Sequence, residues 1–225
     1  MSTTMTSSEF VAKTKWSVKR LLSDLGDIFN VEMEASRVIA AGGAVRDMYF
    51  GRECNDIDIY IEAPFGETPE SCAGFITEHC PSLEGVRCFE DSEYQAGYSG
   101  EAIAFILEAE MLVGVTPKTV QMIFMNHNQV PVRAYVSDFF SCSLSKIYMD
   151  QNGDITYFTD FVKSVEDKVV TFEWDHHDGK PNMKYIRKIL NYFPDYAMDK
   201  QTYDTLTRSF SAAAMNARFE DTLPW

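Results

Sequence analysis

The segment AAGGAVRDMYFGRECNDIDIYI, from Ala40 to Ile61, constrains the fold of this chain more than any other. A short β-branched run, SRVIAAG, leads into two adjacent glycines, as a buried strand does when it ends in a tight turn. The residues AVRDMYFG then have the composition of a short helix closed by Gly51. DIDIYIEA alternates strictly between polar and apolar residues, which is typical of a strand. The order strand, turn, helix, strand predicts an α/β fold.

Asp56 and Asp58 form a pair within the second predicted strand. Residues i and i+2 of a strand share a face, so the two carboxylates are expected side by side, with Ile57 and Ile59 packed into the core behind them. Two like charges held so close are unfavourable without a cation. Mg²⁺ favours carboxylates together with substrate phosphates. The pair therefore predicts a metal site, although such a pair taken alone is also typical of a solvated strand face.

Gly42 and Gly43 precede the predicted helix, where residues without a Cβ let backbone N–H groups approach a phosphate. Arg46 follows about one turn later, in a position to bond phosphate oxygens. Asp47 is expected either to orient Arg46 or to contact the nucleotide to which such phosphates belong. A glycine pair alone can be a simple turn, but together with the aspartate pair these residues predict a site for a nucleoside triphosphate (NTP) and a metal ion.

The residues GGAVRDMYFGRECNDIDIYI resemble the signature of class II tRNA nucleotidyltransferases (CCA-adding enzymes) and bacterial poly(A) polymerases, within the DNA polymerase β-like superfamily. Weaker similarity continues to Phe193. The resemblance implies a nucleotidyltransferase head with a mixed β-sheet flanked by helices, in which Asp56 and Asp58 hold two Mg²⁺ ions. It also implies transfer of a nucleoside monophosphate (NMP) from an NTP to a hydroxyl, most directly at the 3′ end of a tRNA or another RNA.

Further site residues follow from the same resemblance. MKYIRKILNYF is similar to the helix that reads the incoming base, which implies nucleotide-binding roles for Lys184 and Arg187. Asp138 lies in the segment similar to the Asp-Phe motif; it either completes a carboxylate triad with Asp56 and Asp58 or anchors a turn. The chain departs from the family at three positions: Val136 and Ser137 replace two arginines, and Gln121 stands where an acid is frequent.

The chain is expected to have two parts, a head domain with an N-terminal helix over residues 1–174 and a short helical C-terminal segment over residues 175–225. The N-terminal helix is predicted to break near Gly26. Residues 101–112 are predicted to form a strand, and residues 132–150 also have a strand-like composition. Two other candidate sites have simpler interpretations, as a solvated loop for His176 and His177 and as an exposed strand face for Glu108 and Glu110.

Charge limits the partners of the chain. Its 20 Lys and Arg residues against 34 Asp and Glu give a net charge of −14 over 225 residues, which disfavours extended, non-specific nucleic-acid binding. Five cysteines without CxxC spacing predict reduced thiols. No secretory leader or membrane span is predicted, so we expect a cytoplasmic protein without a membrane partner. The oligomeric state is not specified.

Two alternatives to RNA modification stay open at this level. A minimal nucleotidyltransferase could modify a protein or a small molecule instead, which the acidic charge favours. A degenerate relative could bind a nucleotide, RNA or protein without turnover, which the missing arginines and third acid favour.

Overall fold

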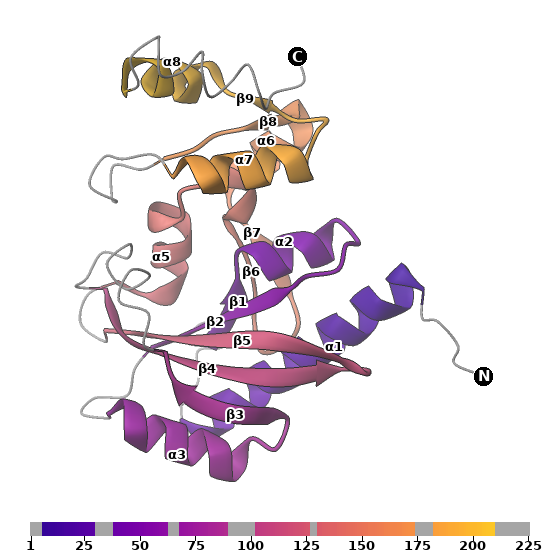
Figure 1. The fold of residues 1–225 in the computed structure, drawn as a ribbon, viewed down its shortest axis with the longest axis vertical. Helices are drawn as coiled ribbons and strands as arrows, with labels where there is room; N and C mark the ends of the chain where they lie inside the picture. Colours follow the sequence, from indigo (N-terminus) through magenta and orange to yellow (C-terminus); the bar gives the residue numbers. More distant parts are fainter. Residues whose placement is uncertain are drawn as a thin grey trace.

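A mixed β-sheet forms the centre of the structure, a computed structural model that describes residues 6–29, 38–62, 68–89, 102–126, 130–173 and 182–209. Over these residues the sheet has seven strands in the order β3-β4-β5-β2-β1-β6-β7. Helices flank it, which confirms the α/β class with a mixed sheet (Figure 1). The strands are β1 (Val38–Ala41), β2 (Asp56–Glu62), β3 (Leu83–Cys88), β4 (Ile103–Val113), β5 (Thr116–Met125), β6 (Ile147–Met149) and β7 (Ile155–Tyr157).

Strand β2 lies in the interior of the sheet, antiparallel to β1 and parallel to β5. Its alternation is the one that the sequence predicts. Ile57, Ile59 and Ile61 are fully buried in the larger core, and burying each such side chain stabilises the fold by about 1.5–3 kcal/mol. Asp56 and Asp58 therefore lie on the opposite face of the sheet.

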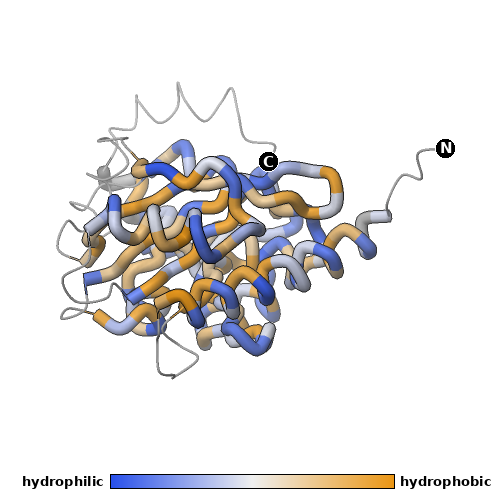
Figure 2. The backbone as a smooth tube through the Cα atoms, turned by 90° about the horizontal axis from the view of Figure 1, so that it is seen from below, coloured by the Kyte–Doolittle hydropathy of each residue, from blue (hydrophilic) through white to orange (hydrophobic). Residues whose placement is uncertain are grey.

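Helices cover both faces of the sheet. α1 (Ser7–Ile28) and α3 (Pro69–His79) pack on the isoleucine face, and α5 (Val132–Phe139) packs on the other. Figure 2 shows apolar and polar residues alternating along the helix nearest the N-terminus, as expected for one buried and one solvated side.

The predicted break in the N-terminal helix is wrong. α1 is continuous from Ser7 to Ile28, and it begins with a capping box between Thr6 and Glu9. Gly26 instead allows a close approach, because a Cβ at this position would collide with the side-chain amide of Gln151.

The strand-like segment from residue 132 to residue 150 is also not what its composition suggests. It contains α5, a 3₁₀ turn (η1, Ser143–Ser145) and only the short strand β6. Val132, Tyr135, Val136 and Phe139 recur with the spacing of one helical face and pack on the smaller core. The predicted strand near residues 101–112 is confirmed as β4.

The C-terminal part of the described chain contains α6 (Thr159–Asp167), α7 (Met183–Tyr192), α8 (Lys200–Ser209) and a small parallel pair, β8 (Val169–Val170) with β9 (Ala197–Met198). Helix α7 lies above α2 (Gly43–Tyr49) in Figure 1, and α8 lies at the end of the molecule far from α3. A domain boundary at residue 174 stays a prediction. His176 and His177 lie outside the described residues.

Two other expectations can be compared with the structure. All five cysteines are free. Across the described residues, the structure contains no helix with the length and apolar character needed to cross a membrane.

Candidate active site

A cleft of about 930 Å³ lies on the aspartate face of the sheet. This cleft is lined by the start of α2, strands β2, β4 and β5, the end of α5 and helix α7. The predicted site residues that line it are Gly42, Gly43, Arg46, Asp47, Asp56 and Asp58. The lining extends from Gly42 to Tyr192, so residues 150 positions apart in the sequence meet in one site.

Two carboxylates of β2, those of Asp56 and Asp58, lie in the cleft. Asp58 lies opposite Gln121 of β5 in the strand register, and Asp56 lies opposite Thr119. Burial, reinforced by the nearby charge of Asp56, raises the pKa of Asp58 to about 7, while the charge of Lys188 opposes this rise. The uncompensated pair is therefore strained electrostatically, and a cation between the carboxylates would relieve that strain.

The carboxylates of Asp56 and Asp58 are donors suited to a magnesium ion, and they do not form the complete ligand set of a structural metal site. Among the residues that the structure describes, no group of three or more His, Cys, Asp and Glu side chains is arranged to hold a metal ion. Mg²⁺ does not need such a cage, because it is commonly bound by one or two carboxylates and completed by waters and substrate phosphates. Asp56 and Asp58 would be the residues that hold it.

Gly42 shapes the turn beside the carboxylates. Its φ of +75° is a conformation that residues with a Cβ rarely adopt, and an added Cβ would lie 3.1 Å from the ring of Phe140. Its N–H donates to the carbonyl of Ile147 at 3.1 Å, so this N–H is already used within the protein. The role of Gly42 is therefore conformational, while Gly43 begins α2 and lines the cleft.

Arg46 and Asp47 form a buried ion pair at the side of the cleft. The Arg46 Nε donates to Asp47 Oδ1 at 2.9 Å, and the two residues are only 5% and 7% exposed. The Arg46 guanidinium lies 5.4 Å from the ring centre of Phe193 and 5.7 Å from that of Tyr192. Arg46 is therefore largely neutralised and held in place, which supports the predicted orienting role of Asp47.

Arg52 joins the end of α2 to the end of α7. Its Nη1 donates to the Tyr192 carbonyl at 2.7 Å, and its guanidinium lies 4.5 Å from the ring centre of Phe193. Tyr192 in turn donates from its hydroxyl to the Glu53 carbonyl at 3.4 Å. These contacts hold α7 over the cleft.

Arg52→Ala is expected to lower the free energy of unfolding by about 1–3 kcal/mol, because it removes a charged hydrogen bond and a cation–π contact together. Urea unfolding measures this change. Arg20→Ala is the matched control, because Arg20 also faces an aromatic ring and an acid, Trp16 and Asp24, but on the exposed side of α1. Its loss should cost less than about 0.5 kcal/mol. Equal costs for the two variants would contradict the bridging role of Arg52.

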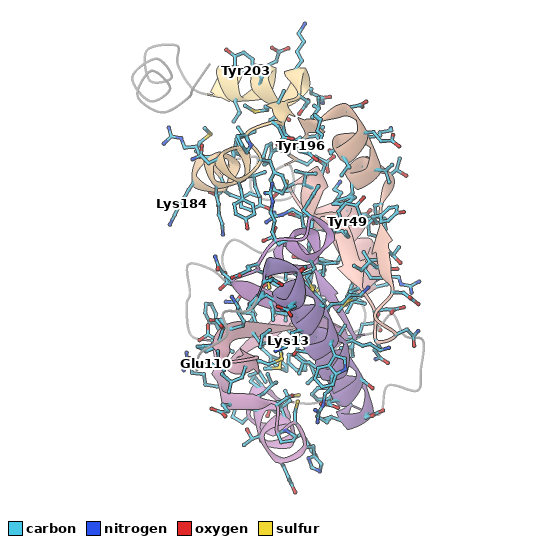
Figure 3. The ribbon with its side chains drawn as sticks, turned by 90° about the vertical axis from the view of Figure 1, so that its right-hand side faces the viewer. Lys13, Tyr49, Glu110, Lys184, Tyr196 and Tyr203 are labelled. Carbon is cyan, nitrogen blue, oxygen red and sulfur yellow. The ribbon has the colours of Figure 1, made fainter. Side chains whose placement is uncertain are left out.

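The remaining predicted residues lie outside the cleft lining. Asp138 is exposed on α5, where it accepts a hydrogen bond from Ser137 at 2.5 Å. Lys184 is exposed and projects outward from α7 (Figure 3), and Arg187 is partly buried on the same helix. The α7 residue that lines the cleft with a positive charge is Lys188.

Two residues of the cleft lining, Lys188 and Glu108, are not assigned a functional role by the sequence. Lys188 was not distinguished from its basic neighbours, because its direction depends on how α7 is docked. The sequence predicts an exposed strand face for Glu108, yet its side chain is only 16% exposed, pairs with Arg87 and lines the cleft. In the strand register Glu108 lies opposite Gln121, and Gln121 lies opposite Asp58. Glu108 is therefore in the same row across the sheet as Asp58. Glu110 is exposed, as expected (Figure 3).

Comparison with known proteins gives a family and a fold. A sequence model described as Gabija anti-defense 2 family protein matches residues 10–168. No curated protein matches the sequence.

Several solved structures share the fold. A CCA-adding enzyme with ATP has a TM-score of 0.58 at 15% identity, over 93% of this chain and 46% of that chain. The Thermotoga maritima CCA-adding enzyme complexed with tRNA has a TM-score of 0.56 at 16% identity, over 88% of this chain and 44% of that chain. A CCA-adding enzyme in its apo form II has a TM-score of 0.59 at 14% identity, over 92% of this chain and 48% of that chain. The chain thus spans about half the length of these structures, and the likeness shows a common nucleotidyltransferase fold.

Proposed function

Because the chain belongs to the Gabija anti-defense 2 family and has a nucleotidyltransferase fold, we propose that it counteracts the Gabija defence as a Mg²⁺-dependent nucleotidyltransferase. In this reaction an acceptor hydroxyl attacks the α-phosphorus of an NTP. The bond to the bridging oxygen breaks, and pyrophosphate leaves as the NMP is joined to the acceptor. The observation that carries the proposal is the Asp56 and Asp58 pair on the face of β2 that forms the cleft.

Different residues of the cleft would have different roles in this reaction. Asp56 and Asp58 would hold magnesium, which supplies activation of the attacking hydroxyl and neutralisation of the leaving pyrophosphate. Gly42 fixes the turn, and Gly43 and Arg46 would lie along the phosphates. Helix α7 would cover the nucleotide and exclude water from the reacting atoms.

The acceptor that we favour is a protein or a small molecule of the defence system. Binding a long polyanion requires many Lys and Arg contacts to phosphates. Arg46 is already paired with Asp47, and the whole chain carries a net charge of −14. An anti-defence role also fits an acceptor that belongs to the defence system.

The second candidate acceptor is the 3′ end of a tRNA or another RNA. It is supported by the fold of the CCA-adding enzymes, one of which is complexed with tRNA. A short single-stranded end needs few phosphate contacts, so the acidic charge is a weaker objection to it than to long RNA.

The test is incorporation of label from each α-labelled NTP with Mg²⁺. Total tRNA and an extract of Gabija-expressing cells are offered separately as acceptors. Label on a protein or a small molecule of the extract supports the favoured acceptor, and label on RNA supports the second candidate. Binding of NTP without label on any acceptor would contradict transfer and leave a protein that uses this fold for binding alone.

A further inference from the structure

The positive charges of the cleft are few, which raises the question of what binds the triphosphate. Among its described lining residues, only Arg46 and Lys188 carry a positive charge. Arg46 lies in a buried ion pair with Asp47 at 2.9 Å, so much of its charge is already compensated. A triphosphate carries several negative charges, and magnesium held by two carboxylates offsets only part of them. Among the described lining residues, Lys188 is therefore the cation whose charge is not already compensated by an ion pair.

Helix α7 places Lys188 on its cleft side. Ile186 and Ile189 are buried and anchor the helix to the core. Tyr185 and Tyr192 lie three residues before and four residues after Lys188, which is the spacing of one helical face, and both line the cleft. Lys188 thus projects between two aromatic residues toward the aspartate face of the sheet.

Electrostatics agree with this placement. The positive charge of Lys188 acts to lower the pKa of Asp58 on β2 and that of Asp47 on α2. Its side chain is exposed, and within the described part of the chain it forms no ion pair. A lysine that faces two acids across a cleft without pairing to either can move onto a phosphate without breaking a salt bridge.

We propose that Lys188 binds the non-reacting phosphates of the NTP, reaching from α7 across the cleft toward the Asp56 and Asp58 pair. The inference rests on the proposed function, because it requires a triphosphate in this cleft. It makes Lys188 a substrate-binding residue and distinguishes it from Lys184, one turn earlier, which lies outside the cleft lining.

The test measures binding rather than turnover. Calorimetry with Mg²⁺ and without acceptor gives the Kd of the NTP that the wild type binds best, and of the corresponding nucleoside. Lys188→Ala is expected to weaken NTP binding by about 10- to 100-fold. Nucleoside binding should stay within about twofold, since the nucleoside has no phosphate for Lys188 to contact.

Three further variants sharpen the comparison. Lys188→Arg keeps the charge and should stay within about threefold of the wild type. Lys163→Ala removes one exposed lysine of α6 outside the cleft lining, so it controls for the loss of net charge. Lys184→Ala tests the competing assignment on α7, and the thermal midpoint of each variant establishes that it is folded.

The outcomes separate this inference from the proposed function. Equal losses for NTP and nucleoside in Lys188→Ala, or a loss that appears in Lys184→Ala instead, would overturn it. A wild type that does not bind any NTP would also overturn it. If the wild type binds NTP but transfers nothing, the proposed function fails, while the comparison of Lys188 variants still decides the inference.

Discussion

If the proposed function holds, Asp58→Asn is expected to reduce nucleotidyl transfer by about a thousandfold or more, because a neutral amide cannot hold the Mg²⁺ that the proposed reaction requires. Asp56→Asn should have an effect of the same order, since the two carboxylates share one face of β2. The rate of label incorporation from an α-labelled NTP measures both losses. Activity within tenfold of the wild type in both variants would contradict the assignment of this pair.

Asp58→Asn should leave the protein folded, so a loss of activity in this variant can be distinguished from a loss of structure. The pKa of Asp58 is raised to about 7 by its burial and by the charge of Asp56, so its ionised form is unfavourable in the folded protein. An uncharged side chain of the same shape removes that repulsion, and the thermal midpoint should be equal to or above that of the wild type. Glu84→Gln, which neutralises an exposed strand residue of β3, is the control and should retain activity.

Gly42→Ala is expected to have the second-largest effect, because it combines backbone strain with a steric conflict. The residue has a φ of +75°, and the new Cβ would lie 3.1 Å from the ring of Phe140. A positive φ costs an alanine about 1–2 kcal/mol, and displacement of the ring adds to that cost, so we expect a loss of about 2–4 kcal/mol in unfolding free energy. Urea unfolding measures the loss, and NTP affinity should fall with it because the turn lines the cleft.

Gly51→Ala is the matched control for this prediction. Gly51 has a similar φ of +67°, but an added Cβ would meet nothing within 4 Å. Its substitution should therefore cost about 1–2 kcal/mol from strain alone and leave NTP binding unchanged. If Gly42→Ala costs no more than Gly51→Ala, the contact with Phe140 does not constrain the turn.

The central part of the fold could be predicted from the sequence because its signals are local. The alternation of DIDIYIE determines which side chains share a face, and the glycine pair marks the turn before α2. Neither feature depends on distant residues. The α/β class and the juxtaposition of Gly43, Arg46, Asp56 and Asp58 therefore agree with expectation.

Other features depend on tertiary contacts that local patterns do not contain. The β-branched residues of α5 suggested strands, but their helical spacing matches a face that packs on the sheet. Three basic residues of α7 have similar local sequence contexts, and only the docking of the helix distinguishes Lys188 from Lys184 and Arg187. The approach of Glu108 to the cleft likewise depends on strand pairing across β5.

The contacts of Arg46 and Arg52 with Tyr192 and Phe193 have a consequence for dissecting this protein into fragments. A fragment that ends at Glu173 would keep Asp56 and Asp58, yet Arg46 and Arg52 would lose their contacts with Tyr192 and Phe193. Arg46 would then be exposed to water with only Asp47 beside it, and the cleft would lack the wall that α7 provides. Supplying α7 as a separate peptide should restore nucleotide binding to such a fragment, with the peptide and the nucleotide each strengthening the binding of the other.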